Sequence, residues 1–195
     1  MDIILASNNQ GKIKEFRKIL AKFGINIKSL KDINYTDEIV EDGNSFYENA
    51  LIKAKTIHEH TGLPVISDDS GICVDYLEGA PGIYSARYKG VETDKGRNLA
   101  LLKDMEGVSD RSAHFHCSIV LYFSEKEIHE FSGDVFGTLD FAEKGENGFG
   151  YDSIFIPNGF SDTFGIIDEE IKNKISHRAN AIKKLVEYLE NDFNF

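Results

Sequence analysis

The stretch LPVISDDSG occupies residues 63–71. Its first half, Leu63 to Ile66, is a short apolar run that predicts a buried strand. Asp68 and Asp69 follow almost at once, so we expect them at the end of that strand, where a parallel sheet presents its site. Adjacent carboxylates suit a divalent cation, and magnesium-dependent phosphate chemistry is the first hypothesis. A plain turn is the alternative, because Asp, Ser and Gly are common turn residues.

Outward from this stretch, strand and helix patterns alternate through the first hundred residues, which favours an α/β fold. Ile3 to Ala6 predicts a strand, and apolar residues at helical spacing then lead to a helix end at Gly24. A capping-box pattern at residues 45–48 opens a second helix that reaches about His60. Further along, the patterns predict a helix over 94–103, an antiparallel strand pair over 113–123 and 127–136 with its tip at 125–126, a short strand over 153–156 and a last helix from Ser176.

Composition limits the class of protein. The chain has 195 residues, of which 41% are hydrophobic, so it can bury a full core as a single domain with two lobes and no independent second domain. Neither a membrane-spanning run nor a signal peptide is present in the sequence, which predicts a soluble cytoplasmic protein. Cys73 and Cys117 have no metal-site spacing, and we expect both to be small buried residues.

The formal net charge of −11 argues against wrapping a nucleic acid, whose phosphates would need neutralising. It does not argue against a single nucleotide. Local lysines, helix N-termini and a metal ion can hold one triphosphate whatever the charge elsewhere. The sequence therefore predicts a small-molecule partner, with no nucleic acid and no membrane.

The segment SNNQGK at residues 7–12 joins the first predicted strand to the first helix. Such a junction can bind an anion with its helix N–H groups, although the glycine spacing of a Walker A loop is absent. The candidate phosphate-binding residues are Ser7, Asn8, Asn9, Gln10, Gly11 and Lys12. The alternative is a polar turn with Asn9 as the helix N-cap.

The second helix places Lys53 at the margin of its apolar face, from where its ammonium group can reach a cleft. Ordinary extension into solvent is the alternative. Glu41 and Asp42 lie just before this helix, where they either complement the helix dipole or bind a metal.

The last helix carries cations in its first turn, where the helix dipole disfavours them. His177 and Arg178 occupy that turn, and Lys172 and Lys174 lie just upstream. Misplaced positive charge favours an anion site over a solvated basic patch. His114 and His116 alternate on one strand face, and we expect histidines of the sheet surface or the core edge rather than a metal pair.

The segment GFGYD at residues 148–152 places two aromatic residues beside glycines on a predicted loop. Glycine allows close approach of a ligand to the backbone, and an exposed ring can stack on a heterocycle. A turn whose rings cover the core is the alternative. Residues 79–88 predict a long irregular loop, which is typical of functional or mobile segments.

Together these segments resemble the Ham1/RdgB family of inosine triphosphate pyrophosphatases, which hydrolyse non-standard purine nucleoside triphosphates to the monophosphate and pyrophosphate. The matching blocks run in family order over nearly the whole chain: SNNQGK at 7–12, ENALIKA at 48–54, SDDSG at 67–71, GAPGIYSARY at 79–88, FHC at 115–117, GFGYD at 148–152 and SHR at 176–178. The resemblance implies an elongated mixed sheet with flanking helices, two lobes around a central cleft, and a homodimer.

The resemblance also implies roles for individual residues. Glu41 and Asp69 would bind Mg²⁺, and Asp69 would be the catalytic base for water. Substrate contacts would come from residues 7–12, Lys53, Ser70, Phe149, Gly150, Tyr151, Asp152, Lys172, His177 and Arg178, with Phe149 stacked on the purine.

Departures from the family pattern are few. Ser7 stands where threonine is frequent, and Ser153 replaces a common proline, which we expect to loosen the loop on the base side. The tail from Asn191 to Phe195 has no assigned counterpart. Two alternatives stay open: a Maf-type pyrophosphatase acting on pyrimidine or modified nucleotides, and a regulator that binds nucleotides without hydrolysis.

Overall fold

The computed structural model describes residues 1–191; the rest of the C-terminal tail, residues 192–195, lies outside this part. It contains a six-stranded sheet in the order β2-β1-β3-β4-β5-β6. The strands are β1 (Asp2–Leu5), β2 (Asn26–Ser29), β3 (Val65–Val74), β4 (Ser112–Ser124), β5 (Glu127–Leu139) and β6 (Phe155–Pro157). β1 pairs in parallel with β2 and β3, whereas β5 and β6 are antiparallel, so the predicted mixed α/β sheet is confirmed.

Most of the helices also agree with the sequence patterns. They are α1 (Gln10–Leu20), α2 (Phe46–Thr61), α3 (Asp94–Asp104), α4 (Glu169–Ile175) and α5 (His177–Asn191). Asn9 caps α1 and Ser45 caps α2, each accepting a backbone N–H with its side chain. The cap at Ser45 was predicted, and the cap at Asn9 was the alternative considered for its segment. Gly24 ends the first helical segment in the left-handed conformation, with φ of 66°.

The described residues divide into two compact units. The first contains Met1–Asp69, Ser118–Ser132 and the described part of Ala181–Phe195, and the second contains Ser70–Cys117 and Gly133–Asn180. The chain passes from one unit to the other within β3, β4, β5 and α5. Within residues 1–191, no helix combines the length and the apolar character that crossing a membrane requires.

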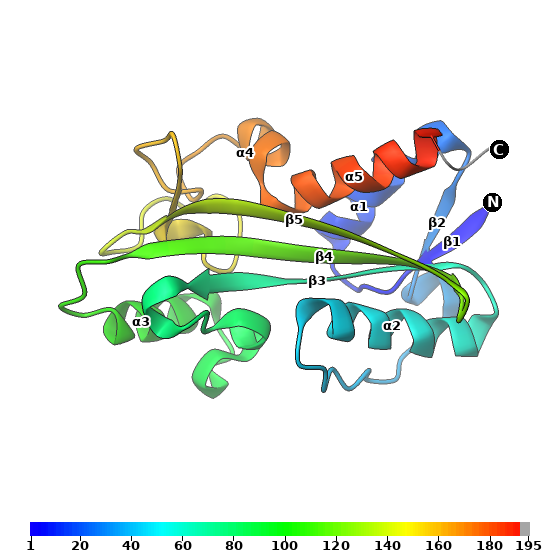
Figure 1. Cartoon of the computed structure of the whole chain (residues 1–195), viewed down its shortest axis with the longest axis horizontal. Helices are drawn as coiled ribbons and strands as arrows, with labels where there is room; N and C mark the ends of the chain where they lie inside the picture. The colour runs from blue at the N-terminus through cyan, green and yellow to red at the C-terminus, as the bar shows by residue number, and fades with distance from the viewer. Residues whose placement is uncertain (192–195) are drawn as a thin grey trace. The chain divides into compact units, whose positions relative to one another are not determined.

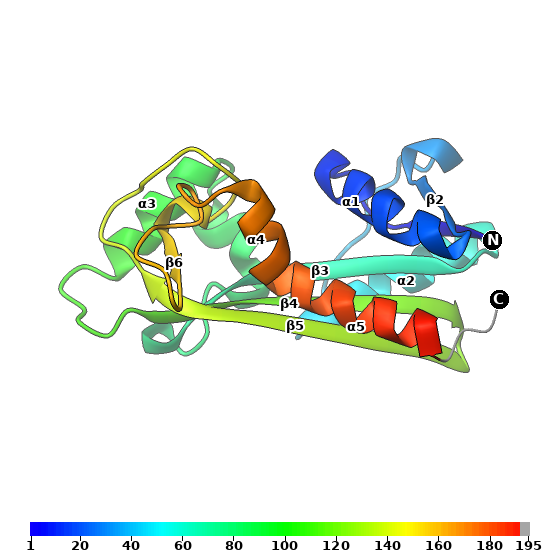
Figure 2. The ribbon, with the colours of Figure 1, turned by 90° about the horizontal axis from the view of Figure 1, so that it is seen from above.

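In the first unit, the strands lie between helices on two faces. Figures 1 and 2 show α2 on one side of the strands and α1 with α5 on the other. The alternation of side chains along β1 explains this arrangement. Ile4 packs into the cluster that α2 completes with Ala50, Ala54 and Ile57. Ile3 and Leu5 are equally buried, and they point to the opposite face.

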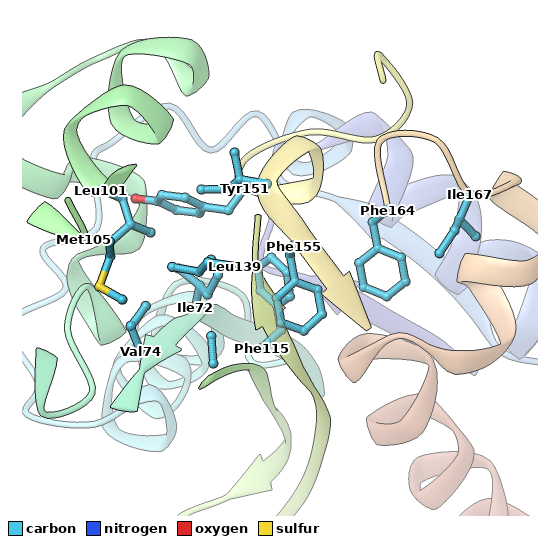
Figure 3. Close-up of a cluster of buried hydrophobic side chains, with 12 residues drawn as sticks. Ile72, Val74, Leu101, Met105, Phe115, Leu139, Tyr151, Phe155, Phe164 and Ile167 are labelled. Atoms are coloured by element: carbon cyan, nitrogen blue, oxygen red, sulfur yellow. The ribbon is translucent and has the colours of Figure 1, made fainter. Parts of the chain in front are cut away.

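The core of the second unit is built around aromatic residues. Phe115 and Phe155 meet edge to face with ring centroids 4.7 Å apart, and Phe164 lies beside Phe155 at 5.5 Å. Leu101 of α3 and Met105, the C-cap of that helix, close the same cluster, which Figure 3 shows together with Tyr151. This core supports the loop that carries the GFGYD segment.

Two features of the fold correct the sequence predictions. The SDDSG segment does not follow a strand; it lies inside β3, which continues to Val74. The polar residues gave the appearance of a turn, but neighbouring strands and packing keep the backbone extended. Residues 79–88 are not wholly irregular either, because Gly82–Gly90 forms a kinked 3-10 helix. Strand β2 and helix α4 were not predicted at all.

Candidate active site

The acidic cluster of the first unit is formed by Glu41, Asp68 and Asp69 with the two lysines that contact them. Lys53 Nζ lies 2.9 Å from Glu41 Oε2 and 3.9 Å from Asp69 Oδ1, so one ammonium group joins the two predicted metal ligands. Lys12 Nζ lies 2.8 Å from Asp68 Oδ2, and the Asp68 side chain is only 1% exposed. The structure therefore brings together residues from three distant parts of the sequence.

Regular elements position this cluster. Asp68 and Asp69 are consecutive in β3, so their side chains leave opposite faces of the strand. Lys53 projects from α2, and Lys12 lies in the first turn of α1. Both lysines are held close to carboxylates, which differs from the extension into solvent considered for Lys53.

The electrostatics of the cluster favour an added cation. Burial raises the pKa of Asp69; Lys53 and a hydrogen bond from Asn49 act against that rise, and the carboxylates of Glu41 and Asp68 add to it. Three carboxylates share two ammonium groups here. A cation bound beside Asp69 would stabilise its ionised form.

A metal ion must be tested against the donors present. Among residues 1–191, no group of three or more His, Cys, Asp or Glu side chains forms a metal-binding set. Mg²⁺ does not require one, because proteins often hold it with one or two carboxylates and leave the other positions to water and substrate phosphates. Glu41 and Asp69, both within 4 Å of the same ammonium nitrogen, fit that kind of site.

The junction between β1 and α1 holds the other predicted phosphate-binding residues. Ser7 Oγ accepts the N–H of Asn9 at 3.1 Å, and Asn9 Oδ1 accepts the N–H of Lys12 at 3.1 Å. Asn9 is thus the N-cap, which was the structural alternative. Asn8, Gln10 and Gly11 are exposed at the same helix N-terminus, a place compatible with an anion.

The aromatic cluster of the second unit consists of Ser70, Phe149, Asp152, Lys172 and Arg178. Phe149 is 55% exposed, and its ring centroid lies 5.0 Å from Lys172 Nζ and 5.9 Å from the guanidinium carbon of Arg178. Lys172 Nζ also contacts Asp152 Oδ2 at 2.5 Å, and Arg178 Nη2 donates to Ser70 Oγ at 3.4 Å. An exposed ring beside two cations suits a heterocycle that carries hydrogen-bond acceptors.

The loop geometry around Phe149 depends on a glycine. Gly148 has φ of +77°, and a Cβ there would lie 2.1 Å from Asp152 Oδ2. The absence of a side chain lets Asp152 Oδ2 reach the N–H of Phe149 at 2.7 Å. Burial raises the pKa of Asp152, while Lys172 and this N–H oppose the rise. The hydrogen bond to Asp152 holds the backbone of Phe149 and leaves its ring exposed.

The remaining predicted residues of the second unit are more buried than the sequence indicated. His177 is 8% exposed and stacks on Phe115 with centroids 4.9 Å apart, and Arg178 is 9% exposed. These two side chains are therefore not a solvated basic patch. Tyr151 is 4% exposed, lies in the core cluster and donates its hydroxyl to Ser85 O at 2.8 Å. Its contact with substrate stays a prediction, as does the contact of Gly150.

Ser153 has hydrogen bonds that argue against the expected loosening of its loop. Its Oγ accepts from Asn98 Nδ2 at 3.0 Å and donates to Glu143 Oε1 at 3.3 Å. The hydroxyl therefore ties the loop to α3. Elsewhere in this unit, His116 Nδ1 lies 2.7 Å from Asp134 Oδ1, and Cys73 is buried, as is Cys117 of the same unit.

Sequence reasoning missed Asn49, the buried neighbour of Asp69. Its Nδ2 donates to Asp69 Oδ2 at 3.1 Å. The available signal was its position one helical turn before Lys53, which places the two side chains on the same face of α2.

Comparisons with known proteins agree with one another over nearly the full chain. The model of the Ham1 family matches residues 3–188. The dITP/XTP pyrophosphatase of Bacillus licheniformis is 47% identical over 192 residues, covering 97% of this chain and 98% of the relative. That of Bacillus subtilis is 42% identical over 192 residues, covering 97% of each.

Solved structures give the same result for the fold. The Ham1 protein of Staphylococcus aureus superimposes with a TM-score of 0.92 at 38% identity, covering 98% of this chain and 100% of the other. A HAM1 protein from Coxiella burnetii gives 0.93 at 38% identity, covering 97% and 98%.

Proposed function

The chain belongs to the Ham1 family, and on that premise we propose that it is a Mg²⁺-dependent nucleoside triphosphate pyrophosphatase. It hydrolyses the non-standard purine nucleotides ITP, dITP and XTP to the monophosphate and pyrophosphate, removing them from the nucleotide pool. The names of relatives at 42–47% identity, dITP/XTP pyrophosphatase, support the substrate class. The observation that carries the proposal is the pair of carboxylates, Glu41 and Asp69, held by the single ammonium group of Lys53.

The reaction is attack of water on the α-phosphorus. A bond forms between the water oxygen and that phosphorus, the bond to the α–β bridging oxygen breaks, and pyrophosphate leaves. Little covalent work falls to the protein, so alignment and charge neutralisation supply most of the rate. Asp69 accepts the proton of the attacking water.

The acidic cluster and its lysines neutralise the charge of the phosphates. Glu41 and Asp69 would hold Mg²⁺, which when bound would supply positive charge to the phosphate oxygens. Lys12 and Lys53, together with the N-terminus of α1 around Ser7 and Asn9, offset the negative charge that grows on the leaving pyrophosphate. Their existing carboxylate partners keep both ammonium groups in place before substrate arrives.

The aromatic cluster supplies base recognition. Phe149 stacks on the purine, and Lys172 and Arg178 present donors beside it. A 6-oxo group accepts from such donors, whereas the 6-amino group of adenine would leave them unpaired, which costs binding energy. Asp152 and His177 complete the contacts to the base edge and sugar.

One assay tests this function. Release of pyrophosphate and of orthophosphate is measured separately for ITP, dITP, XTP, ATP, dATP, GTP, dTTP and UTP, with Mg²⁺ and with EDTA. We expect pyrophosphate from ITP, dITP and XTP far above that from ATP and dATP, and none with EDTA. Faster turnover of dTTP or UTP would favour the Maf-type alternative, and orthophosphate would mean cleavage at another bond. Binding without hydrolysis would favour the regulator.

The homodimer and the cytoplasmic location belong to the same proposal. Light scattering coupled to size exclusion tests the first, because a dimer of a 21.9 kDa chain has twice that mass. A peak at the mass of one chain would contradict it. Cell fractionation tests the location.

A further inference from the structure

The side chain of Asn49 joins two segments that are distant in sequence. Asn49 is only 1% exposed, although it carries an amide. Its Oδ1 accepts the N–H of Gly43 at 2.9 Å, and its Nδ2 donates to Asp69 Oδ2 at 3.1 Å. One amide therefore connects the loop before α2 to strand β3. Both contacts lie within the first unit.

Only glycine fits at position 43 in this contact. A Cβ at position 43 would lie 2.9 Å from Asn49 Oδ1 and 2.7 Å from Glu48 Cβ, so the loop can approach α2 this closely only with glycine. Glu41 lies two residues earlier in the same loop. Fixing the backbone at Gly43 therefore restricts where the Glu41 carboxylate can go.

Asn49 and Lys53 act on the same two acids by different means. They are four residues apart on α2, so they lie on the same face of the helix. Lys53 attracts Glu41 and Asp69 through its charge. Asn49 carries no charge, and its hydrogen bonds to Asp69 and Gly43 have defined directions. The lysine reduces repulsion between the carboxylates, whereas the amide sets their geometry.

We propose that Asn49 is a positioning residue, which sets Glu41 and Asp69 at the separation and orientation that a divalent cation requires. The proposal rests on the proposed function, since it concerns the same two carboxylates. Residues behind the direct ligands of a metal commonly change its affinity or the activity by roughly 10- to 100-fold when they are replaced.

The test compares Asn49→Ala with Asn98→Ala. Asn98 of the second unit is a matched control, because it is 2% exposed and donates its Nδ2 at 2.9 Å to a different carboxylate, that of Glu143. Gly43→Ala is a second variant that disturbs the same link from its other end. The measurements are the unfolding midpoint, kcat and KM for dITP, and Mn²⁺ affinity without nucleotide by electron paramagnetic resonance.

For Asn49→Ala we expect Mn²⁺ affinity and kcat each to fall roughly 10- to 100-fold, with KM changed less than about threefold. Gly43→Ala should change both in the same direction. Asn98→Ala should lose a comparable amount of thermal stability and keep its Mn²⁺ affinity. The proposal is overturned if Asn49→Ala folds and binds Mn²⁺ as tightly as Asn98→Ala does. If Asn49→Ala does not fold, Gly43→Ala decides, and a Mn²⁺ affinity equal to that of the wild type would overturn the proposal.

Failure of the proposed function has a different signature. A wild-type protein that releases no pyrophosphate from any triphosphate would remove the kinetic readout, but Mn²⁺ affinity would still separate Asn49→Ala from its control. The positioning role is then decided by metal binding alone.

Discussion

The acidic cluster of the first unit and the aromatic cluster of the second have opposite charge balances. The acidic cluster sets three carboxylates against two ammonium groups. In the aromatic cluster, the single carboxylate of Asp152 faces Lys172 and Arg178. An excess of acid suits a metal ion, and an excess of cation beside an exposed ring suits an electron-rich base.

The two clusters also differ in how they are supported. In the acidic cluster, Asp69 and three of its neighbours project from a strand or from helices, and Glu41 lies on a loop. In the aromatic cluster, Lys172 and Arg178 project from helices, but Phe149, the proposed stacking residue, lies on a loop. Groups on regular elements are held in the narrow geometry that chemistry needs, whereas a loop can adapt to the shape of a base. We therefore expect changes in the acidic cluster to act on kcat and changes in the aromatic cluster to act on KM.

The largest effect should follow Asp69→Asn. Loss of a general base typically costs about 10²- to 10⁴-fold in rate, and here a proposed metal ligand is weakened as well. Pyrophosphate release from dITP should fall by at least that factor, while equilibrium dialysis still detects nucleotide binding. Turnover within tenfold of the wild type would place the base elsewhere and break the division of labour between the clusters.

A smaller effect, on KM rather than on kcat, should follow Phe149→Ala. Stacking of a base on an aromatic side chain contributes about 1–3 kcal/mol, which corresponds to roughly a 5- to 150-fold increase in KM. The control is Phe136→Ala, since Phe136 of the same unit is also exposed, at 59%. Steady-state kinetics with dITP should show a raised KM for the first variant only. Equal kinetics in the two variants would remove Phe149 from base recognition.

The sequence predicted the regular elements better than the irregular ones. Apolar spacing and caps identified α1, α2, α3 and the strand pair, because these signals are local and repeat along the chain. The two-residue tip at Glu125–Lys126 was also correct. Helix α4 was missed because its seven residues, Glu169–Ile175, are mostly polar and none is buried. Short elements of this kind are stabilised by their neighbours rather than by their own pattern.

Within the candidate site, residue types were easier to predict than contacts. Carboxylates, lysines and an exposed phenylalanine could be identified from their segments. That Lys12 pairs with Asp68, and that Asn49 joins Gly43 to Asp69, depends on packing between α1, α2 and β3. The position of SDDSG inside β3 has the same origin: turn-forming residues adopt an extended conformation when neighbouring strands supply their hydrogen bonds.

The smallest effect concerns stability and contrasts one aspartate from each unit, the half-buried Asp69 and the buried Asp140. Burial raises the pKa of Asp69. Burial acts the same way on Asp140, but Lys144 and the N–H of Phe141 outweigh it and lower the pKa of Asp140. Because the pKa of Asp69 is raised, folding disfavours its ionised form. The resulting loss of stability appears as the pH rises from the pKa of Asp69 in the unfolded state to its pKa in the folded state. Because the pKa of Asp140 is lowered, its ionised form stabilises the fold at pH values above the pKa that it has in the unfolded state. This contribution is lost as the pH falls through the folded-state pKa.

In EDTA at pH 7, Asp69→Asn should therefore raise the unfolding midpoint and Asp140→Asn should lower it, by about 2–4 °C for each kcal/mol. Both differences from the wild type should shrink as the pH is lowered towards the range in which the aspartates are protonated. Differential scanning calorimetry across pH 4 to 8 measures this. If Asp69→Asn were the less stable variant, the carboxylate would be stabilised by its lysine more than it is penalised by burial and by its acidic neighbours. The acidic cluster would then be an ion-pair network that is complete without a metal, and the contrast in charge balance between the two clusters would lose its basis.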